Sequence, residues 1–232
     1  PGRKPDEHTK IVLEQMIPAL KEAIARGEVS PRFADVFHET GVFDAQQTRA
    51  ILEACRKECG LEPAFHGDEL HNVGSAELAG EFGAVSVSHL ETVSDAGIVA
   101  LAKRPSFAVL LPTTAYLMRL TPPPARKLIA GNVPVALGSD YNPKAHCLSM
   151  PHTMNLACVL MKMSMEEALV ASTLNSAAAL GMADNYGTLE VGKWGDCFIL
   201  NAPRWEHLIY EMSDPQITHV FKKGHLVYEK KN

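Results

Sequence analysis

Residues 62–91 have the sequence EPAFHGDELHNVGSAELAGEFGAVSVSHLE, which contains a strand, a helix and a second strand in that order. The two ends are short and apolar, as buried strands are, whereas SAELAGEF has the composition of a helix. Gly83 follows this helix at the place where a helix commonly stops. Because two strands joined by such a helix run parallel, with a right-handed connection, the stretch predicts a parallel α/β sheet.

The same alternation continues on both sides of this stretch. Further strands are predicted at residues 32–39, 107–112 and 133–140. Helices are predicted at residues 7–26, 44–58, 94–103 and 121–131, and Asp44 with Gln47 forms a capping box at the start of the second. Five strands alternating with helices fit either an open doubly wound sheet or a β/α barrel.

The last part of the chain has a different pattern. Two more helices are predicted at residues 151–163 and 165–180. From about residue 187, apolar and polar residues alternate between glycine turns, which predicts a few antiparallel strands. We therefore expect two domains, an α/β body at residues 1–186 and a small β domain at residues 187–232.

Composition excludes several classes of protein. The chain has 232 residues and a net charge of −5, so nucleic acid and anionic membranes are not expected partners. No apolar run reaches the roughly 18 residues of a membrane helix, and no signal peptide opens the chain, so we expect a cytoplasmic protein. The five cysteines form no C-x-x-C pair and are expected to be reduced. Dinucleotide, P-loop and serine-hydrolase motifs are absent from the sequence.

Polar side chains gather where the predicted strands end. His66 and Glu69 follow the strand at 62–65, His89 ends the next strand, and Asp140 ends the strand at 133–140. In a parallel sheet or barrel these ends lie on one face, where active sites are built. His66 and Asp140 could bind a metal there, with Glu69 and His89 available for proton transfer and carbonyl polarisation.

Each of these residues also has a simpler interpretation. A single histidine at a strand end is usually a hydrogen-bonded loop residue, and Asp140 in S-D-Y-N-P could cap a turn. Glu69 could be a solvated acid near a helix start. The joint pattern favours a site, because three successive strand ends would have to coincide by chance. His146 and His152 could also line the pocket, but nothing in the sequence decides this.

Four motifs at strand ends carry a family resemblance: HGDEL at 66–70, SHLE at 88–91, LPTTAY at 111–116 and ALGSDYNP at 136–143. Together they resemble the imidazolonepropionase family of the amidohydrolase superfamily, over nearly the whole chain. The closing GTLEVGKWGDCFIL and G-x-L-V-Y are similar to the superfamily's return to a small β-sandwich. The resemblance implies the C-terminal part, about strands 4–8, of a metal-dependent (β/α)8 TIM barrel, plus a few strands of that sandwich.

The resemblance also implies roles for five residues. His66 and Asp140 match metal ligands for one zinc or iron ion, which would lower the pKa of a bound water towards ~7. Glu69, His89 and Asp140 match the catalytic residues, and Glu69, His89 and Asn142 match substrate or product contacts. The implied reaction is hydrolysis of the cyclic amide of 4-imidazolone-5-propanoate to N-formimidoyl-L-glutamate, in histidine degradation.

The sequence departs from the family pattern in two ways. Lys144 and Ala145 stand where the family has Gly-Thr, so substrate contacts at these positions are not carried over. None of the ten histidines forms the H-x-H pair that supplies two further metal ligands on the first barrel strand. We therefore expect a C-terminal portion that alone binds metal weakly and turns over poorly.

Two other functions fit the sequence. One is another amidohydrolase activity, such as a cytosine- or guanine-type deaminase, since H-x-x-E is shared. The other is a non-catalytic scaffold that retains the fold. The expected partner is a small-molecule substrate, and a homodimer is consistent with the superfamily.

Overall fold

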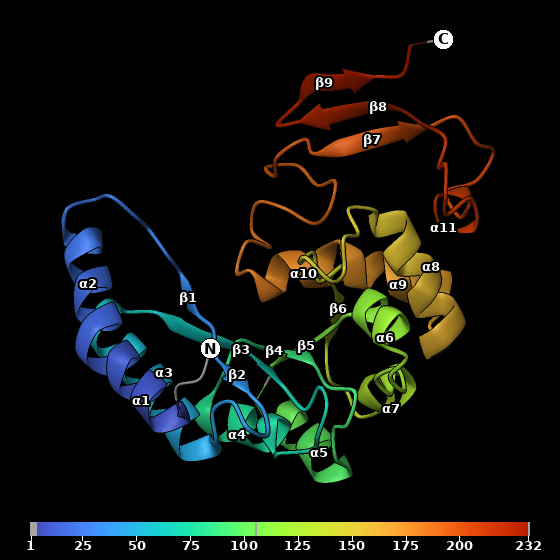
Figure 1. The fold of residues 1–232 in the computed structure, drawn as a ribbon. Helices are drawn as coiled ribbons and strands as arrows, with labels where there is room; N and C mark the ends of the chain where they lie inside the picture. The colour runs from blue at the N-terminus through green and yellow to red at the C-terminus, as the bar shows by residue number, and fades with distance from the viewer. Residues whose placement is uncertain (1–3, 105, 232) are drawn as a thin grey trace. The chain divides into compact units, whose positions relative to one another are not determined.

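The computed structural model describes residues 4–104 and 106–231, which divide into two compact units (Figure 1). The first comprises Pro1–Ala108 and Lys127–Pro134, and the second comprises Val109–Arg126 and Val135–Asn232. The predicted alternation of helices and parallel strands is confirmed. The predicted domain boundary near residue 187 stays a prediction.

The first unit begins with the helix predicted at residues 7–26. It comprises α1 (Pro5–Ile11), a π-helical stretch η1 (Val12–Met16) and α2 (Ile17–Ala25). α2 packs on α3 (Ala45–Cys59).

The predicted capping box starts α3. The Gln47 N–H donates to Asp44 Oδ1 at 2.8 Å, and the Asp44 N–H donates to Gln47 Oε1 at 3.0 Å. α3 ends at Gly60, which has a φ of 70°. Both ends of the helix are therefore encoded locally.

The strands of the first unit are parallel. β3 (Glu62–Gly67) pairs with β4 (Ser86–His89) so that His66 lies opposite Ser88, and Gly67 opposite His89. The strand predicted at 32–39 is divided into β1 (Phe33–Ala34) and β2 (Phe37–His38), both paired with β3. At the break, the Asp35 side chain bonds to β3 instead. The order is β1–β3–β4–β5, and β5 (Phe107–Leu110) joins through the Phe107 N–H to Val85 O.

Two helices of this unit pack closely together. α4 (Ser75–Phe82) and α5 (Asp95–Lys103) meet at Gly80, where a Cβ atom would lie 2.7 Å from the Ala100 carbonyl oxygen. The buried side chains of the unit include Leu52, Phe65, Val87 and Leu101. This packing fixes the strand ends from which the candidate side chains project.

The second unit holds the end of β5 and β6 (Val135–Leu137), linked by the Gly138 N–H to Leu110 O. Its helices include α6 (Pro112–Met118), α8 (Met150–Met161), α9 (Met165–Ser172) and α10 (Leu174–Ala179). α6 was not predicted, although Pro112 stands in its first turn, where proline is favoured. The helix predicted at 165–180 is interrupted at Thr173, whose φ and ψ are −123° and −88°.

The helix predicted at 121–131 is the short α7 (Ala125–Ala130), which spans the division between the units. Its prolines, residues 122–124, precede the helix instead of occupying its first turn.

The C-terminal strands are antiparallel, as predicted. β7 (Cys197–Leu200), β8 (Ile217–Lys222) and β9 (His225–Glu229) form a three-stranded sheet in that order, and a short helix α11 (His207–Tyr210) lies between β7 and β8 in sequence. All five cysteines are free. In the described part of the chain, every helix is too short or too polar to cross a membrane.

Candidate active site

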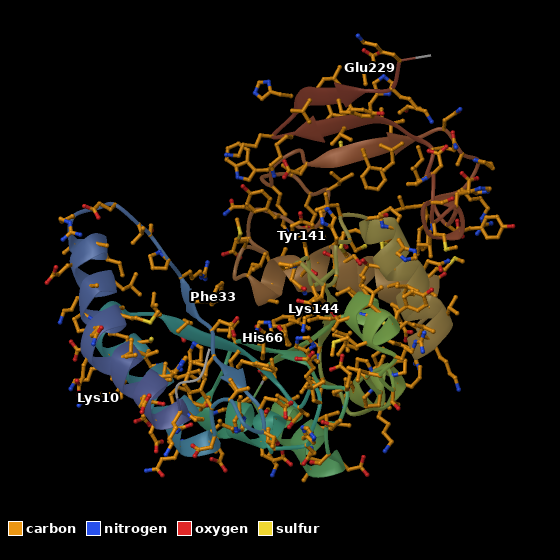
Figure 2. The ribbon with its side chains drawn as sticks, viewed as in Figure 1. Lys10, Phe33, His66, Tyr141, Lys144 and Glu229 are labelled. Carbon is orange, nitrogen blue, oxygen red and sulfur yellow. The ribbon has the colours of Figure 1, made fainter. Side chains whose placement is uncertain are left out.

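His66, labelled in Figure 2, lies in β3. A carboxylate of the neighbouring segment positions its ring. Its Nδ1 atom lies 2.8 Å from Asp35 Oδ1. Because a carboxylate can only accept, Nδ1 carries the proton and the lone pair of the neutral ring is on Nε2. A histidine held in this way by a carboxylate is the arrangement that metal-binding histidines use.

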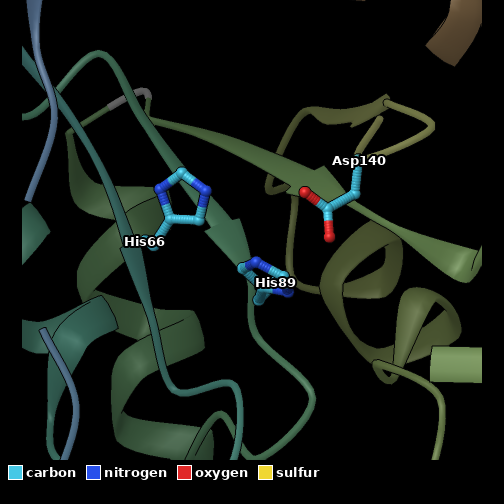
Figure 3. A group of neighbouring side chains, drawn as sticks. All are labelled: His66, His89 and Asp140. Carbon is cyan, nitrogen blue, oxygen red and sulfur yellow. The ribbon is translucent and has the colours of Figure 1, made fainter. Parts of the chain in front are cut away.

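His89 and Glu69 form a buried pair beside His66. His89 ends β4 with 2% of its surface exposed, and its Nε2 atom lies 3.6 Å from Glu69 Oε2. The rings of His66 and His89 lie 5.2 Å apart between centroids, and their ligand nitrogens lie within 4.8 Å (Figure 3). The structure thus brings together three predicted site residues in the first unit.

The backbone at the end of β4 is strained. His89 and Leu90 have φ values of 82° and 66°, in the left-handed region that disfavours side chains, at a cost of roughly 1–3 kcal/mol each. The Leu90 N–H donates to Gly67 O at 3.2 Å and the Thr92 N–H to Asp68 O at 2.8 Å. These bonds to the neighbouring strand end hold the turn that presents His89.

Asp68 fixes the residue before Glu69. It is fully buried and accepts hydrogen bonds from three backbone N–H groups at 3.0–3.1 Å, those of Val73, Ser75 and Ala76. These donors lie at and just before the start of α4, where the unpaired N–H groups of a helix favour an acid. Asp68 therefore ties the start of the loop to a helix.

Glu39 fixes the residues after Glu69. Its buried carboxylate accepts from the N–H groups of Leu70 at 2.9 Å and His71 at 3.3 Å, and from His71 Nδ1 at 2.9 Å. Burial raises the pKa of Glu39, but the hydrogen bonds from Leu70, Thr40 and His71 outweigh it, so the pKa lies below its ordinary value. Glu69 is thus held between two buried acids, neither of which was predicted as a site residue.

Asp140 belongs to the second unit and lies three residues after the end of β6. Its φ is 49°, and its carboxylate accepts a hydrogen bond from the hydroxyl of Thr114 in α6. The Asn142 side chain donates to Asp140 O at 2.8 Å and accepts from the N–H groups of Lys144 and Ala145. Asn142 therefore stabilises the Asp140 loop, while its predicted contact with a ligand stays a prediction.

The two remaining histidines of this region have local partners. The His146 ring packs edge-on against Tyr141, with centroids 4.9 Å apart. His152 lies in the first turn of α8, where its N–H donates to Ser149 Oγ. Neither arrangement gives these histidines a role in chemistry.

A comparison with known protein families identifies the family. The profile of the amidohydrolase family matches residues 3–227. A Danio rerio protein named "Probable imidazolonepropionase" is 54% identical over 230 residues, which cover 98% of this chain and 53% of the relative. The chain therefore spans about half the length of the relative.

Two solved structures share the fold at low sequence identity. E. coli guanine deaminase has a TM-score of 0.73 and 18% identity over 94% of this chain and 60% of its own. An adenosine deaminase from Xanthomonas campestris with bound zinc has a TM-score of 0.67 and 21% identity over 80% of this chain and 49% of its own. From the profile match, which extends over nearly its full length, the chain belongs to the amidohydrolase family.

Proposed function

We propose that this chain carries the acid–base residues of an imidazolonepropionase, a metal-dependent hydrolase of the cyclic amide in 4-imidazolone-5-propanoate. The product is N-formimidoyl-L-glutamate. The observation that carries the proposal is the buried pair of Glu69 and His89 next to His66, in a chain 54% identical to a relative that bears this name.

The proposed metal ligands are His66 and Asp140, drawn with His89 in Figure 3. Imidazole and carboxylate suit zinc or iron, and the Asp35 contact gives His66 the tautomer that a ligand needs. The bound ion would supply Lewis-acid polarisation and an acidified water. His89 is then left to contact the substrate.

The buried residues have roles that follow from their surroundings. His89, when protonated at Nε2, donates a hydrogen bond to the ring carbonyl as negative charge develops on its oxygen. Glu69 carries a proton to the leaving ring nitrogen. Its carboxylate lies 3.6 Å from His89 Nε2, so both side chains can reach the same substrate ring. Asp140 accepts a proton from the attacking water. Asn142 holds the Asp140 loop and contacts the product.

The proposal includes further properties of the whole protein. Its partner is a small molecule and its location is the cytoplasm, and a homodimer is consistent with the superfamily. The identity of the metal, zinc or iron, is decided by which ion restores turnover after chelation.

The test uses a chimera in which this chain replaces the matching part of the Danio rerio relative. We expect metal-dependent ring opening, seen as loss of the imidazolone absorbance and formation of the formimidoyl product by mass spectrometry. Glu69→Gln should lower kcat by about 10²–10⁴-fold, the usual contribution of a general acid or base, with the fold intact. Glu81→Gln on the exposed face of α4 is the matched control and should be unaffected.

Two outcomes contradict the proposal. Ammonia release from guanine or cytosine, without ring opening of the imidazolone, would indicate a deaminase. Full turnover by the Glu69→Gln chimera would mean that this chain acts as a scaffold only.

A further inference from the structure

A second carboxylate faces His89 from the side opposite Glu69. Glu91 lies two residues after His89, and its side chain is 2% exposed. Its Oε1 atom lies 3.6 Å from His89 Nδ1, whereas Glu69 lies 3.6 Å from Nε2. The imidazole therefore has an acid at each nitrogen.

Both facing groups are left without hydrogen bonds. Among residues 4–104 and 106–231, nothing donates a hydrogen bond to either carboxylate oxygen of Glu91. His89 Nδ1 likewise has no hydrogen-bond partner among these residues. A buried charge without a partner is costly, so a buried acid and a buried nitrogen that face each other would be expected to pair. A charge-assisted hydrogen bond is about 2.7–2.9 Å long, so closing the gap needs a shift of less than about 1 Å.

We propose that Glu91 is a positioning residue that accepts a hydrogen bond from the Nδ1–H of His89. This hydrogen bond would hold the ring with its Nε2 atom on the Glu69 side. A buried acid that orients a catalytic imidazole through its other nitrogen is the logic of catalytic triads. The catalytic meaning rests on the proposed function, whereas the pairing of Glu91 with His89 does not.

The position of Glu91 favours orientation over direct chemistry. Its carboxylate is on the Nδ1 side, away from Glu69, and its backbone follows the strained residues His89 and Leu90. Backbone strain at two successive residues is typical of functional sites, where the strained turn gives a side chain the orientation that it needs. Glu91 therefore acts through His89.

The experiment is nitrogen-15 NMR of the metal-free chain with labelled histidine, at about pH 8.5, roughly two units above the ordinary pKa of histidine. The His89 signals are identified by their loss in His89→Gln. We expect a proton on Nδ1 in the natural chain, its transfer to Nε2 in Glu91→Leu, and its retention in Glu91→Gln, whose amide oxygen still accepts. A natural chain without a proton on Nδ1, or a Glu91→Leu variant that keeps it, would overturn the proposal.

Turnover by the chimera separates this proposal from the proposed function. Glu91→Leu should lower kcat about 10–100-fold and Glu91→Gln should restore most of it, which is the size of effect that supporting residues have. If the chimera opens no imidazolone ring but the NMR result holds, the proposed function fails and the Glu91 pairing stands. If the ring opens normally in Glu91→Leu, the positioning role is contradicted.

Discussion

The Nδ1 atom of His66 lies 2.8 Å from the Oδ1 atom of Asp35, in the break between β1 and β2. The contact fixes the tautomer of an imidazole at the end of a parallel strand. Asp35 lies where the segment at 32–39 is divided between β1 and β2, so its side chain supports His66 from the gap between the two short strands.

This contact predicts an effect on metal affinity. Asp35→Ala should weaken zinc binding by the chain about 10–100-fold, because His66 loses the partner that sets its tautomer. The measurement is competition with a chromophoric zinc chelator. Asp214→Ala, which removes an exposed carboxylate of the second unit, is the control and should bind as the natural chain does. Equal affinities for Asp35→Ala and the control would show that Asp35 has no part in the site.

The natural chain itself should bind zinc weakly. The sequence has no H-x-H pair, so the proposed ligand set from this chain is one imidazole and one carboxylate, fewer than zinc usually takes from protein. Calorimetric titration should give an affinity weaker than micromolar. Sub-micromolar one-to-one binding would contradict this.

The acid Glu39 predicts a pH dependence of stability. Its pKa in the folded chain lies below the ordinary 4.5, so it stabilises the fold above that pH, and the contribution is lost as pH falls through the folded pKa. Glu39→Gln should therefore be less stable than the natural chain at about pH 7, with the difference shrinking towards about pH 3.

Urea unfolding at the two pH values measures this difference. Glu62→Gln, at an exposed carboxylate of β3, is the control for loss of one negative charge. If the free energy of unfolding of Glu39→Gln differs from that of the natural chain by the same amount at both pH values, the hydrogen-bonded carboxylate is not the source of the difference.

The capping box of α3 predicts a local effect on stability. Asp44→Ala removes the acceptor of the Gln47 N–H and should lower the free energy of unfolding by about 0.5–2 kcal/mol. Asp44→Ser keeps a capping oxygen and should lose less. Denaturation midpoints measure both, and equal losses would mean that the side-chain oxygen at this position does not cap the helix.

Local signals explain which elements the sequence could predict. The start of α3 is encoded by Asp44 and Gln47 and its end by Gly60, and each of these signals acts within one turn of the helix end that it marks. The break at Thr173 is different, because α9 and α10 share one apolar pattern and no proline or glycine marks the change of direction. α6 was missed because the apolar run of β5 continues through Leu111 to Pro112, the first residue of the helix.

The candidate site also contains some residues that the sequence could predict and others that it could not. His66, Glu69 and His89 could be predicted because parallel strands place their ends on one edge, a consequence of topology alone. Glu39 and Asp35 could not, since each supports a residue about thirty positions away and only the folded pairing of strands brings them there. Glu91 lies inside the SHLE motif, but its relation to Nδ1 depends on the left-handed backbone at His89.

A double-mutant cycle on zinc affinity tests the central proposal that His66, in β3, and Asp140, after β6, are ligands of one ion. His66→Ala and Asp140→Ala should each weaken zinc binding at least about tenfold. The loss of binding free energy in the double variant should be smaller than the sum of the two single losses, because removing either ligand already disables the same site. His219→Ala, at a histidine of β8, is the control and should bind zinc as the natural chain does. Additive losses, or an Asp140→Ala variant with unchanged affinity, would contradict the account.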